Sequence, residues 1–409
     1  MTNKNMPEVR FPGFTEEWEQ RKLGDMMDVT SVKRIHQSDW TNSGIRFLRA
    51  RDIVSAAKNE EPSDYLYISE EKYNEYSKIS GKVSQGDLLV TGVGSIGVPL
   101  LITDDNPIYF KDGNIIWFKN EHKIDGNFFY YSFINNKIQK YIRDVAGIGT
   151  VGTYTIDSGK KTPISLPTYD EQIKIGSFFK QLDDTIALHQ RELELLKETK
   201  KGFLQKMFPK EGEKVPEIRF PGFTEEWEQR KLGDIFKKDI QKNKDLEFHS
   251  DSVISVAKMK LSPPSTKSSD EYMKTYNKIW KGNIAFEGHT NDEFPNGRFV
   301  LNDCQDGIVS HIYDVYSAVD KYDNEFMKRY INNPYVMRKI LINATSSARM
   351  MKSLNSLEFL KQSILLPVLS EQHKIGGFFY QLDNTIALHQ RELDLLKETK
   401  KGFLQKLFV

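Results

Sequence analysis

The chain has 409 residues, which is long for one domain and favours two or three folded units. Its 58 basic and 57 acidic residues nearly cancel, so the net charge of +1 does not by itself indicate a nucleic-acid-binding protein. The single cysteine, Cys304, excludes an intrachain disulfide framework and a zinc site built from cysteines. No run of about 18 apolar residues occurs and the N-terminus has no apolar signal segment, so we expect a soluble, cytoplasmic chain.

The first element in chain order is a block that occurs twice. Residues 7–25 read PEVRFPGFTEEWEQRKLGD, and residues 216–234 repeat this text with isoleucine in place of valine. Thr15 followed by two glutamates is typical of a helix N-cap, and Gly24 is typical of the residue that ends a helix. The block therefore predicts a short helix, with Trp18 as a local core anchor.

The segment that follows the first block, residues 26–165, predicts a mixed, strand-rich domain. Alternating residues at 45–51 predict a strand that places Arg49 and Arg51 on one face. Further elements are expected at 87–90 and 115–118 (strands) and at 128–142 (helix).

A second insert, residues 235–365, shares no comparable identity with the first but predicts the same order of elements. These elements are strands at 253–258 and 283–286 and a helix at 326–342. We therefore expect one fold that carries two different surfaces.

Gly92–Gly97 (GVGSIG) matches the glycine-rich fingerprint of dinucleotide-binding sites. A functional fingerprint must open a helix, whereas residues 98–102 are apolar, contain a proline and predict a strand. Nucleotide binding is therefore disfavoured; a loop that lets another ligand approach the backbone and a plain turn both stay open. No phosphate-binding loop occurs and the eight histidines are scattered, so we predict no catalytic residue and no metal site.

A second repeated block, residues 166–209 and 366–409, predicts a long helix in each copy. Apolar residues recur in alternating steps of four and three, which is the heptad seam of a coiled coil. The seam residues are Ile175, Phe179, Leu182, Ile186, Leu193 and Leu196 in the first copy and Ile375, Phe379, Leu382, Ile386, Leu393 and Leu396 in the second. His189 and Lys200 occupy imperfect seam positions, which can fix the register.

Isolated helices of this kind are only marginally stable, so each seam needs a partner. Repeated units in closed assemblies are usually related by a two-fold axis, so we predict an antiparallel coiled coil with internal pseudo-two-fold symmetry. Packing of each helix on its own neighbouring domain is the alternative. The seam from Ile175 to Met207 would form a rod of roughly 50 Å.

The inserts carry basic and hydrogen-bonding side chains that suit DNA. Arginine and asparagine can bind base edges in the major groove, whereas lysine, serine and threonine hold phosphates. Candidates in the first insert are Lys33, Arg34, Arg46, Arg49, Arg51, Thr91, Ser95, Thr150 and Tyr154. Candidates in the second are Lys258, Lys260, His289, Thr290, Asn291, Asn296, Arg298, Ser346, Arg349 and Lys352. For any one of them, the alternative is an ordinary surface side chain.

Four short sequences accompany the repeats: LRARDI at 48–53, GDLL at 86–89, LP…EQ…I at 166–175 and FPGF…W…KLGD at 220–234. Together with the order of short block, variable module and long helix, repeated once, they resemble the specificity (S) subunit of a Type I restriction–modification system. The resemblance covers the whole chain. The second insert departs from it at Gly288-His289-Thr290, where the family often has a glycine–serine or glycine–threonine loop.

The resemblance implies an α+β fold with two mixed α/β target recognition domains joined by two long helices. Its parts would be a repeat block (1–25), a recognition domain (26–165), a central helix (166–209), a linker with the second block (210–234), a second recognition domain (235–365) and a C-terminal helix (366–409). Each domain would bind one half of a bipartite, asymmetric double-stranded DNA target, and the coiled coil would set the spacer.

The same resemblance implies partners that carry the chemistry. The repeated regions would recruit two methyltransferase (M) subunits, and restriction (R) subunits would join for cleavage. S-adenosylmethionine, ATP and Mg²⁺ would belong to those partners, and neither a cofactor nor a membrane is implied for this chain. The alternative is a non-catalytic coiled-coil scaffold whose inserts bind proteins.

Overall fold

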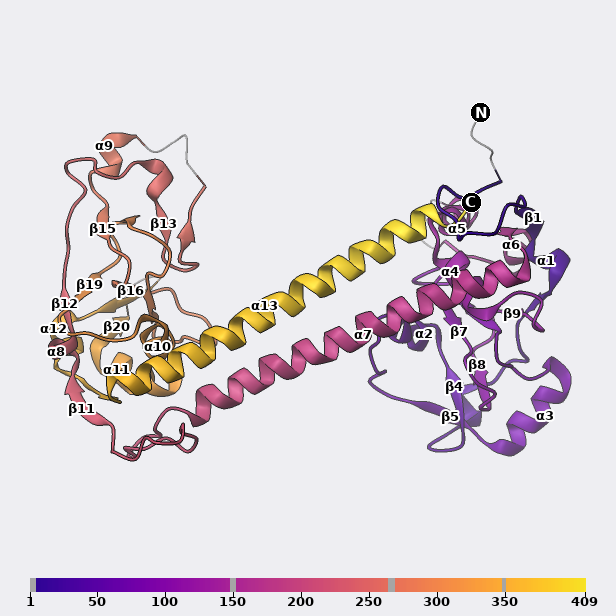
Figure 1. The fold of residues 1–409 in the computed structure, drawn as a ribbon. Coiled ribbons are helices and arrows are strands. Elements are labelled where there is room, and N and C mark those ends of the chain that lie inside the picture. Colours follow the sequence, from indigo (N-terminus) through magenta and orange to yellow (C-terminus); the bar gives the residue numbers. More distant parts are fainter. Residues whose placement is uncertain (1–4, 148–151, 264–268, 348–350) are drawn as a thin grey trace. The chain divides into compact units, whose positions relative to one another are not determined.

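The computed structural model is a mixed helix and sheet fold, as predicted, and it describes residues 5–147, 152–263, 269–347 and 351–409 (Figure 1). Its contacts divide the chain into two units. Unit 1 comprises Met1–Gln190 and Arg391–Val409, and unit 2 comprises Arg191–Gln390. Each unit therefore contains one insert and a part of both long helices. Among the described residues, no helix is both long and apolar enough to cross a membrane.

Unit 1 is built around two four-stranded sheets. Its strands are β1 (Glu19–Lys22), β2 (Asp28–Thr30), β3 (Trp40–Thr41), β4 (Ile45–Leu48), β5 (Leu66–Ile68), β6 (Leu88–Thr91), β7 (Pro99–Leu101), β8 (Ile108–Phe110), β9 (Ile115–Lys119) and β10 (Pro163–Leu166). Its helices are α1 (Leu23–Met26), η1 (Gln37–Asp39), α2 (Ala50–Ala57), α3 (Glu70–Ser80), α4 (Gly126–Ile134), α5 (Asn136–Ala146), α6 (Ile156–Lys161) and the first part of α7 (Tyr169–Lys206). The sheets have the orders β2-β9-β6-β7 and β3-β5-β4-β8.

Unit 2 has one four-stranded sheet, in the order β12-β19-β16-β17, and several two-stranded pairs. Its strands are β11 (Glu228–Lys231), β12 (Phe236–Lys238), β13 (Ile254–Ser255), β14 (Lys260–Leu261), β15 (Asn277–Ile279), β16 (Ile284–Glu287), β17 (Arg298–Leu301), β18 (Gly307–Val309), β19 (Val315–Ala318), β20 (Thr345–Ser347), β21 (Lys352–Leu354) and β22 (Ser363–Leu366). Its helices are α8 (Leu232–Ile235), η2 (Ser250–Ser252), α9 (Asp270–Met273), α10 (Asn324–Tyr330), α11 (Pro334–Ala344), α12 (Ser356–Lys361) and the first part of α13 (Leu369–Lys406).

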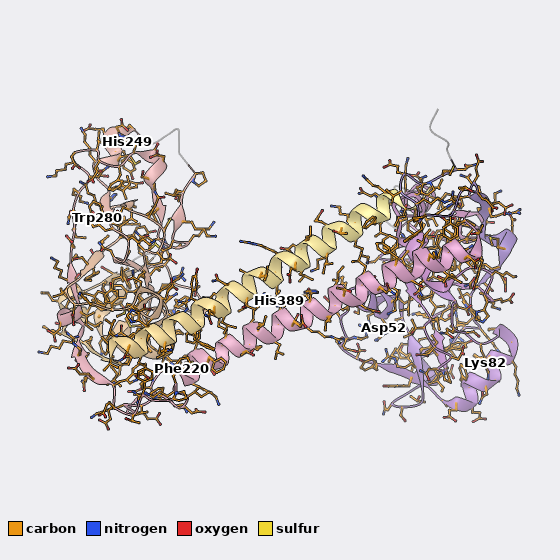
Figure 2. All side chains as sticks on the ribbon, viewed as in Figure 1. Asp52, Lys82, Phe220, His249, Trp280 and His389 are labelled. Atoms are coloured by element: carbon orange, nitrogen blue, oxygen red, sulfur yellow. The ribbon has the colours of Figure 1, made fainter. Side chains whose placement is uncertain are left out.

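The sheets β2-β9-β6-β7 and β12-β19-β16-β17 have the same antiparallel topology. The prediction of one fold with two surfaces is confirmed for this sheet. It is wrong for the outer part of each unit, which lies around Lys82 in unit 1 and around His249 and Trp280 in unit 2 (Figure 2). The outer core of unit 1 contains large rings such as Phe47 and Trp117, which cover a second sheet. The outer core of unit 2 is smaller and mainly aliphatic, and it contains residues of short strand pairs together with Ala285 and Val315 of the four-stranded sheet.

Several predicted elements have different boundaries. The strand expected at 45–51 ends at Leu48, because the Arg49 backbone N–H donates to Asp52 (2.7 Å) and Arg49 becomes the N-cap of α2. The helix expected at 128–142 is two helices, since Asn135 caps α5 by accepting from the Lys137 backbone N–H. In the second insert, likewise, the strand at 253–258 shortens to β13, and the helix at 326–342 divides into α10 and α11.

The repeated block does not form the helix expected between Thr15 and Gly24; a four-residue helix instead begins near its end, at Leu23 in α1 and at Leu232 in α8. The block forms β1, which runs antiparallel to β10, and in unit 2 the same block forms β11, which pairs with β22. Gly24 does not end a helix but permits close packing, because a Cβ at this position would lie 2.7 Å from the Lys160 Cβ. Trp18 and Trp227 are 2% and 1% exposed, which confirms them as core anchors.

Within unit 1, the first half of α7 runs antiparallel to the end of α13 (Figure 1). The Phe178 and Phe403 rings pack with centroids 5.1 Å apart, and Asp183 forms an ion pair with Lys400 (2.6 Å). Asp183 also accepts from the Tyr131 hydroxyl of α4 (2.7 Å), so the helix pair is joined to the domain. The two helices pair antiparallel in this unit, as predicted. The ring contact uses Phe178, which lies outside the predicted seam, whereas the seam residue Phe179 packs against Tyr131 of α4 (5.0 Å), so packing on the neighbouring domain holds for that residue.

Unit 2 repeats the arrangement with the other halves of the helices. Phe203 and Phe378 pack at 5.0 Å, and Lys200 reaches Asp383 at 2.7 Å. Asp383 also binds Arg329 of α10 (2.5 Å). Burial alone would raise the pKa of Asp383, but the hydrogen bonds and positive charges of Lys200 and Arg329 outweigh burial and lower this pKa.

The structure places every proposed seam residue in a buried or half-buried position. The most buried, at most 2% exposed, are Ile175, Phe179, Leu193, Ile375, Phe379 and Leu393. The half-buried ones are Leu182, Ile186, Leu196, Leu382, Ile386 and Leu396.

Two adjacent glycines of α13 provide a test of how tightly this helix packs on unit 2. A Cβ at Gly376 would lie 2.3 Å from Asp323 Oδ1, the atom that caps α10 by accepting from the Phe326 backbone N–H (2.8 Å). We expect Gly376→Ala to reduce the free energy of unfolding by about 1–3 kcal/mol, because the cap must move. Gly377 has open space around it, so Gly377→Ala should stabilise the helix by about 0.5–1 kcal/mol. Urea unfolding of both variants measures the difference, and equal effects would contradict the close contact.

Candidate nucleic-acid interface

The hairpin β6–β7 of unit 1 contains the glycine-rich sequence 92–97. The Thr91 hydroxyl accepts from the Val98 backbone N–H (2.9 Å) and donates to the Ser95 carbonyl, so the loop is closed by its own residues. A strand follows it, as predicted, and the loop opens no helix. Ser95 is exposed at the tip, and Gly92 accepts from the Tyr154 backbone N–H (2.9 Å). The motif is therefore a turn that displays polar groups and is supported by the segment around Tyr154.

The hairpin β16–β17 occupies the same place in the sheet of unit 2. Its loop exposes His289, Thr290 and Asn291, and Asn291 Oδ1 accepts from the Phe294 backbone N–H (2.8 Å). The Lys352 backbone N–H donates to the Gly288 carbonyl (2.8 Å), which docks the β20–β21 hairpin against this loop.

The structure brings several candidate residues of the second insert together around this hairpin. Arg298 begins β17, donates from Nη2 to the Ala257 carbonyl (2.8 Å) and lies over the Phe294 ring. The candidates of this insert with exposed side chains are Lys258, Lys260, His289, Thr290, Asn291 and Ser346, and those that are half-buried are Asn296, Arg298 and Lys352. Arg298 thus links the β16–β17 loop to the lysines that follow Ala257.

The basic candidates of unit 1 lie instead in or beside the outer sheet β3-β5-β4-β8. Lys33 Nζ lies 4.1 Å from the centre of the Tyr76 ring, and Arg34 forms an ion pair with Asp112 (2.9 Å). Arg46 stacks over Tyr65, with its Cζ 3.8 Å from the ring centre. Lys33 and Arg34 are exposed and Arg46 is half-buried. These three side chains keep a charged group within reach of solvent, as a phosphate contact requires.

Arg49 and Arg51 hold a loop of unit 1 rather than lying side by side on a strand. The Arg49 guanidinium donates to Asp52 (2.9 and 3.0 Å) and to Asp64 (2.9 Å), and Arg51 pairs with Asp64 (2.6 Å). The hydrogen bonds from Arg49 to Asp52 raise the pKa of Arg49. The hydrogen bonds from Arg49 to Asp64 lower the pKa of Asp64. The Arg49 side chain is 13% exposed, which leaves little of it for DNA.

We therefore expect Arg49→Ala to act on stability and not on base preference. The change leaves the buried Asp52 (labelled in Figure 2) without its strongest partner, at a cost of about 2 kcal/mol in the free energy of unfolding. Arg298→Ala is the matched control. The Arg298 side chain is half-buried, so part of it can reach DNA, and its loss should weaken DNA binding. Urea unfolding and binding to a panel of duplexes separate the two effects. Altered base preference in Arg49→Ala at unchanged stability would contradict this assignment.

Three further candidates remain, of which only Tyr154 lies within the described residues. Thr150 and Arg349 lie outside the described residues. Tyr154 is 2% exposed, burial raises the pKa of its hydroxyl, and its oxygen lies 2.5 Å from Thr162 Oγ1. Tyr154 is a core residue in this structure, because its side chain packs into the hydrophobic core of unit 1 and not toward solvent.

The sequence interpretation missed two sets of residues. Arg10 of the repeated block forms a two-pronged ion pair with Glu171 of α7, and Arg219 forms the same pair with Glu371. The repetition of both partners in the sequence was the available signal. Glu287, a buried carboxylate at the end of β16, was also missed, because nothing in the sequence distinguishes it from an exposed glutamate.

The fold is shared with specificity subunits of known structure. The S subunit of a Type I restriction–modification system from M. genitalium aligns over 99% of both chains with a TM-score of 0.57 and 14% identity. The HsdS subunit of Thermoanaerobacter tengcongensis aligns over 98% of both chains with a TM-score of 0.51 and 14% identity. At such identities the likeness establishes the architecture.

The family follows from the sequence itself. The model of the Type I restriction modification DNA specificity domain matches twice, at residues 15–198 and 224–398, so the chain belongs to this family. The MjaIX specificity subunit of Methanocaldococcus jannaschii is 21% identical over 430 residues, which covers 96% of this chain and 93% of that protein. A protein of Haemophilus influenzae named as a type I restriction enzyme specificity subunit is 32% identical over 163 residues, which covers 40% of this chain and 39% of that protein.

Proposed function

We propose that this chain is the DNA-specificity subunit of a Type I restriction–modification complex, in which residues 26–165 and 235–365 each bind one half of a bipartite, asymmetric target. The observation that carries the proposal is one sheet topology with two different hairpins. Units 1 and 2 present β6–β7 and β16–β17 at the same place in equivalent sheets, but with different polar residues. Equal scaffolds with unequal hydrogen-bonding groups suit the recognition of two unlike base sequences.

We propose that the repeated regions recruit equivalent methyltransferase (M) subunits. The leucines at equivalent positions of α7 and α13 are unusually exposed: Leu188 and Leu388 by 55% and 53%, and Leu195 and Leu395 by 68% and 69%. Exposed leucines outside the seam suit a helical partner. The restriction (R) subunits would join this assembly, and S-adenosylmethionine, ATP and Mg²⁺ would be bound by the partners.

We propose that α7 and α13 set the length of the unread spacer. Each helix has 38 residues, so each is about 57 Å long, which exceeds the roughly 34 Å of one turn of DNA. Both helices are continuous through the two units, so a change in their length would change the separation of the two recognition modules.

Binding at varied salt tests this function directly. The full chain, purified with its M subunit, should bind a duplex that carries its target more tightly than a scrambled duplex at every salt concentration. The affinity for both duplexes should fall as salt rises, since phosphate contacts release counterions, while the ratio between them persists. Equal affinities for target and scrambled duplex would exclude sequence-specific recognition and favour a protein-binding scaffold.

A further inference from the structure

Glu287, the last residue of β16, is a buried carboxylate beside an exposed histidine. The residue is 3% exposed, and its Oε1 lies within hydrogen-bond distance of the backbone N (3.1 Å) and Nδ1 (2.5 Å) of His289. Its Oε2 is buried and has no hydrogen-bond partner among the described residues. Buried polar atoms normally have partners, so the unpartnered oxygen of this carboxylate is an unusual feature.

The carboxylate determines which nitrogen of His289 faces outward. Oε1 already accepts from the His289 backbone N–H, so we assign it as the acceptor of a hydrogen bond from Nδ1–H as well. Nε2 is then left for another partner, on a side chain that is 60% exposed. The backbone between them is held as well, because a Cβ at Gly288 would lie 2.3 Å from the Lys352 carbonyl oxygen.

The neighbouring charges leave this pair intact. Arg298 lies opposite Glu287 in the strand register, but its guanidinium donates to the Ala257 carbonyl (2.8 Å) and lies over Phe294. Burial, and after it the negative charge of Glu287, raises the pKa of Tyr313. His289 is therefore the side chain that hydrogen-bonds to Glu287.

Unit 1 has different chemistry at the equivalent position. Thr91 ends β6 as Glu287 ends β16, and its hydroxyl is satisfied within the loop by Val98 and Ser95. The polar group of unit 1 thus stabilises the turn, whereas the Glu287–His289 pair of unit 2 directs a ring nitrogen outward. A difference of this kind, at one position of a shared scaffold, is where a difference in sequence preference would arise.

We propose that the Glu287–His289 pair determines one position of the half-site bound by the second module. His289 Nε2 would hydrogen-bond to a base edge in the major groove, and Glu287 would be a positioning residue that fixes the ring. This inference rests on the proposed function, namely that unit 2 binds DNA sequence-specifically. Because a single nitrogen addresses a single base pair, the pair should control one position and leave the first half-site unchanged.

Paired substitutions of His289 test the role of Nε2. The full chain with its M subunit is bound to duplexes in which each target base pair is replaced in turn. His289→Asn can keep a contact with Glu287 but lacks Nε2, so it should lose about tenfold in discrimination at one base pair. His289→Gln places an amide nearer the Nε2 position and should retain part of this discrimination. Glu293→Gln, at an exposed residue of the same loop that is not a binding candidate, is the control for the loop itself.

Substitutions of Glu287 test whether this residue positions the ring of His289. Glu287→Ala should lose discrimination at the same base pair, and Glu287→Gln should retain part of it, because the amide oxygen can accept from both His289 donors. Adding Glu287→Ala to His289→Asn should cause no further loss, since both residues act through one contact.

The outcomes distinguish this inference from the function on which it rests. Full discrimination by His289→Asn, or equal weakening on every duplex, would overturn the role of the pair while sequence-specific binding stands. A lack of sequence-specific binding by the unchanged chain would overturn the proposed function, and the inference with it.

Discussion

Replacing Glu171 with alanine is expected to lower the free energy of unfolding of unit 1 by about 3–5 kcal/mol. Glu171 is fully buried and accepts from Nε and Nη2 of Arg10, each at 2.7 Å. The Arg10 side chain is only 11% exposed, so loss of the carboxylate leaves a guanidinium without its counter-charge in a site with little water. Hydrogen bonds to Glu171 are also the main cause of the raised pKa of Arg10. Urea unfolding of the full chain measures the change.

Three variants control for this result. Asp170→Ala removes the adjacent, exposed carboxylate and should have a much smaller effect. Glu371→Ala breaks the equivalent pair with Arg219 (2.7 and 2.8 Å) and should destabilise unit 2 by a similar amount. Arg10→Met combined with Glu171→Leu should recover most of the loss, because no unpaired charge remains buried. If Glu171→Ala were as mild as Asp170→Ala, this ion pair would not anchor the repeated block to the long helix.

Inserting four residues into both long helices is expected to abolish methylation of the original motif and to create one with a longer spacer. Four helical residues add about 6 Å, which lies between one and two base-pair steps of about 3.4 Å. The insertions belong after Gln190 and after Gln390, where each helix passes from one unit to the other. Contacts inside each unit, such as those of Lys200 with Asp383 and Lys400 with Asp183, then keep their partners.

The register of the helices supplies the controls for this experiment. A seven-residue insertion in both helices preserves the heptad phase and should lengthen the spacer further. An insertion in α7 alone leaves the two helices unequal in length and should disturb folding, which circular dichroism detects. A folded double insertion that still methylates the unaltered motif would contradict the role of the helices as a spacer.

The helices and the repeated organisation were predictable because their signals are periodic. Heptad spacing from Ile175 onward specifies a helix whatever surrounds it, and α7 and α13 extend through the predicted stretches. Local patterns were less informative where a long-range contact decides the conformation. Glu19–Lys22 of the repeated block form a strand because they pair with β10, and Gly24 lets α6 pack closely. Neither contact is visible in a short window of sequence.

The candidate site was only partly predictable for the same reason. Arg49 was expected on a strand face, but a hydrogen bond from its own backbone to Asp52 starts a helix there and its guanidinium is held by two carboxylates. Tyr154 is buried by contacts with Gly92 and Thr162 that lie in other segments. His289 was chosen for its polarity alone; the buried partner that orients it became visible only in three dimensions.

Methylation mapping by single-molecule sequencing of DNA from cells with and without this gene shows whether the chain directs methylation to a specific sequence. We expect one bipartite, asymmetric adenine-methylation motif to disappear with the gene. We also expect complementation with Arg298→Ala to alter one half of that motif and to leave the other half unchanged. Methylation that is the same with and without the gene would contradict DNA recognition by this chain and favour a scaffold whose inserts bind proteins.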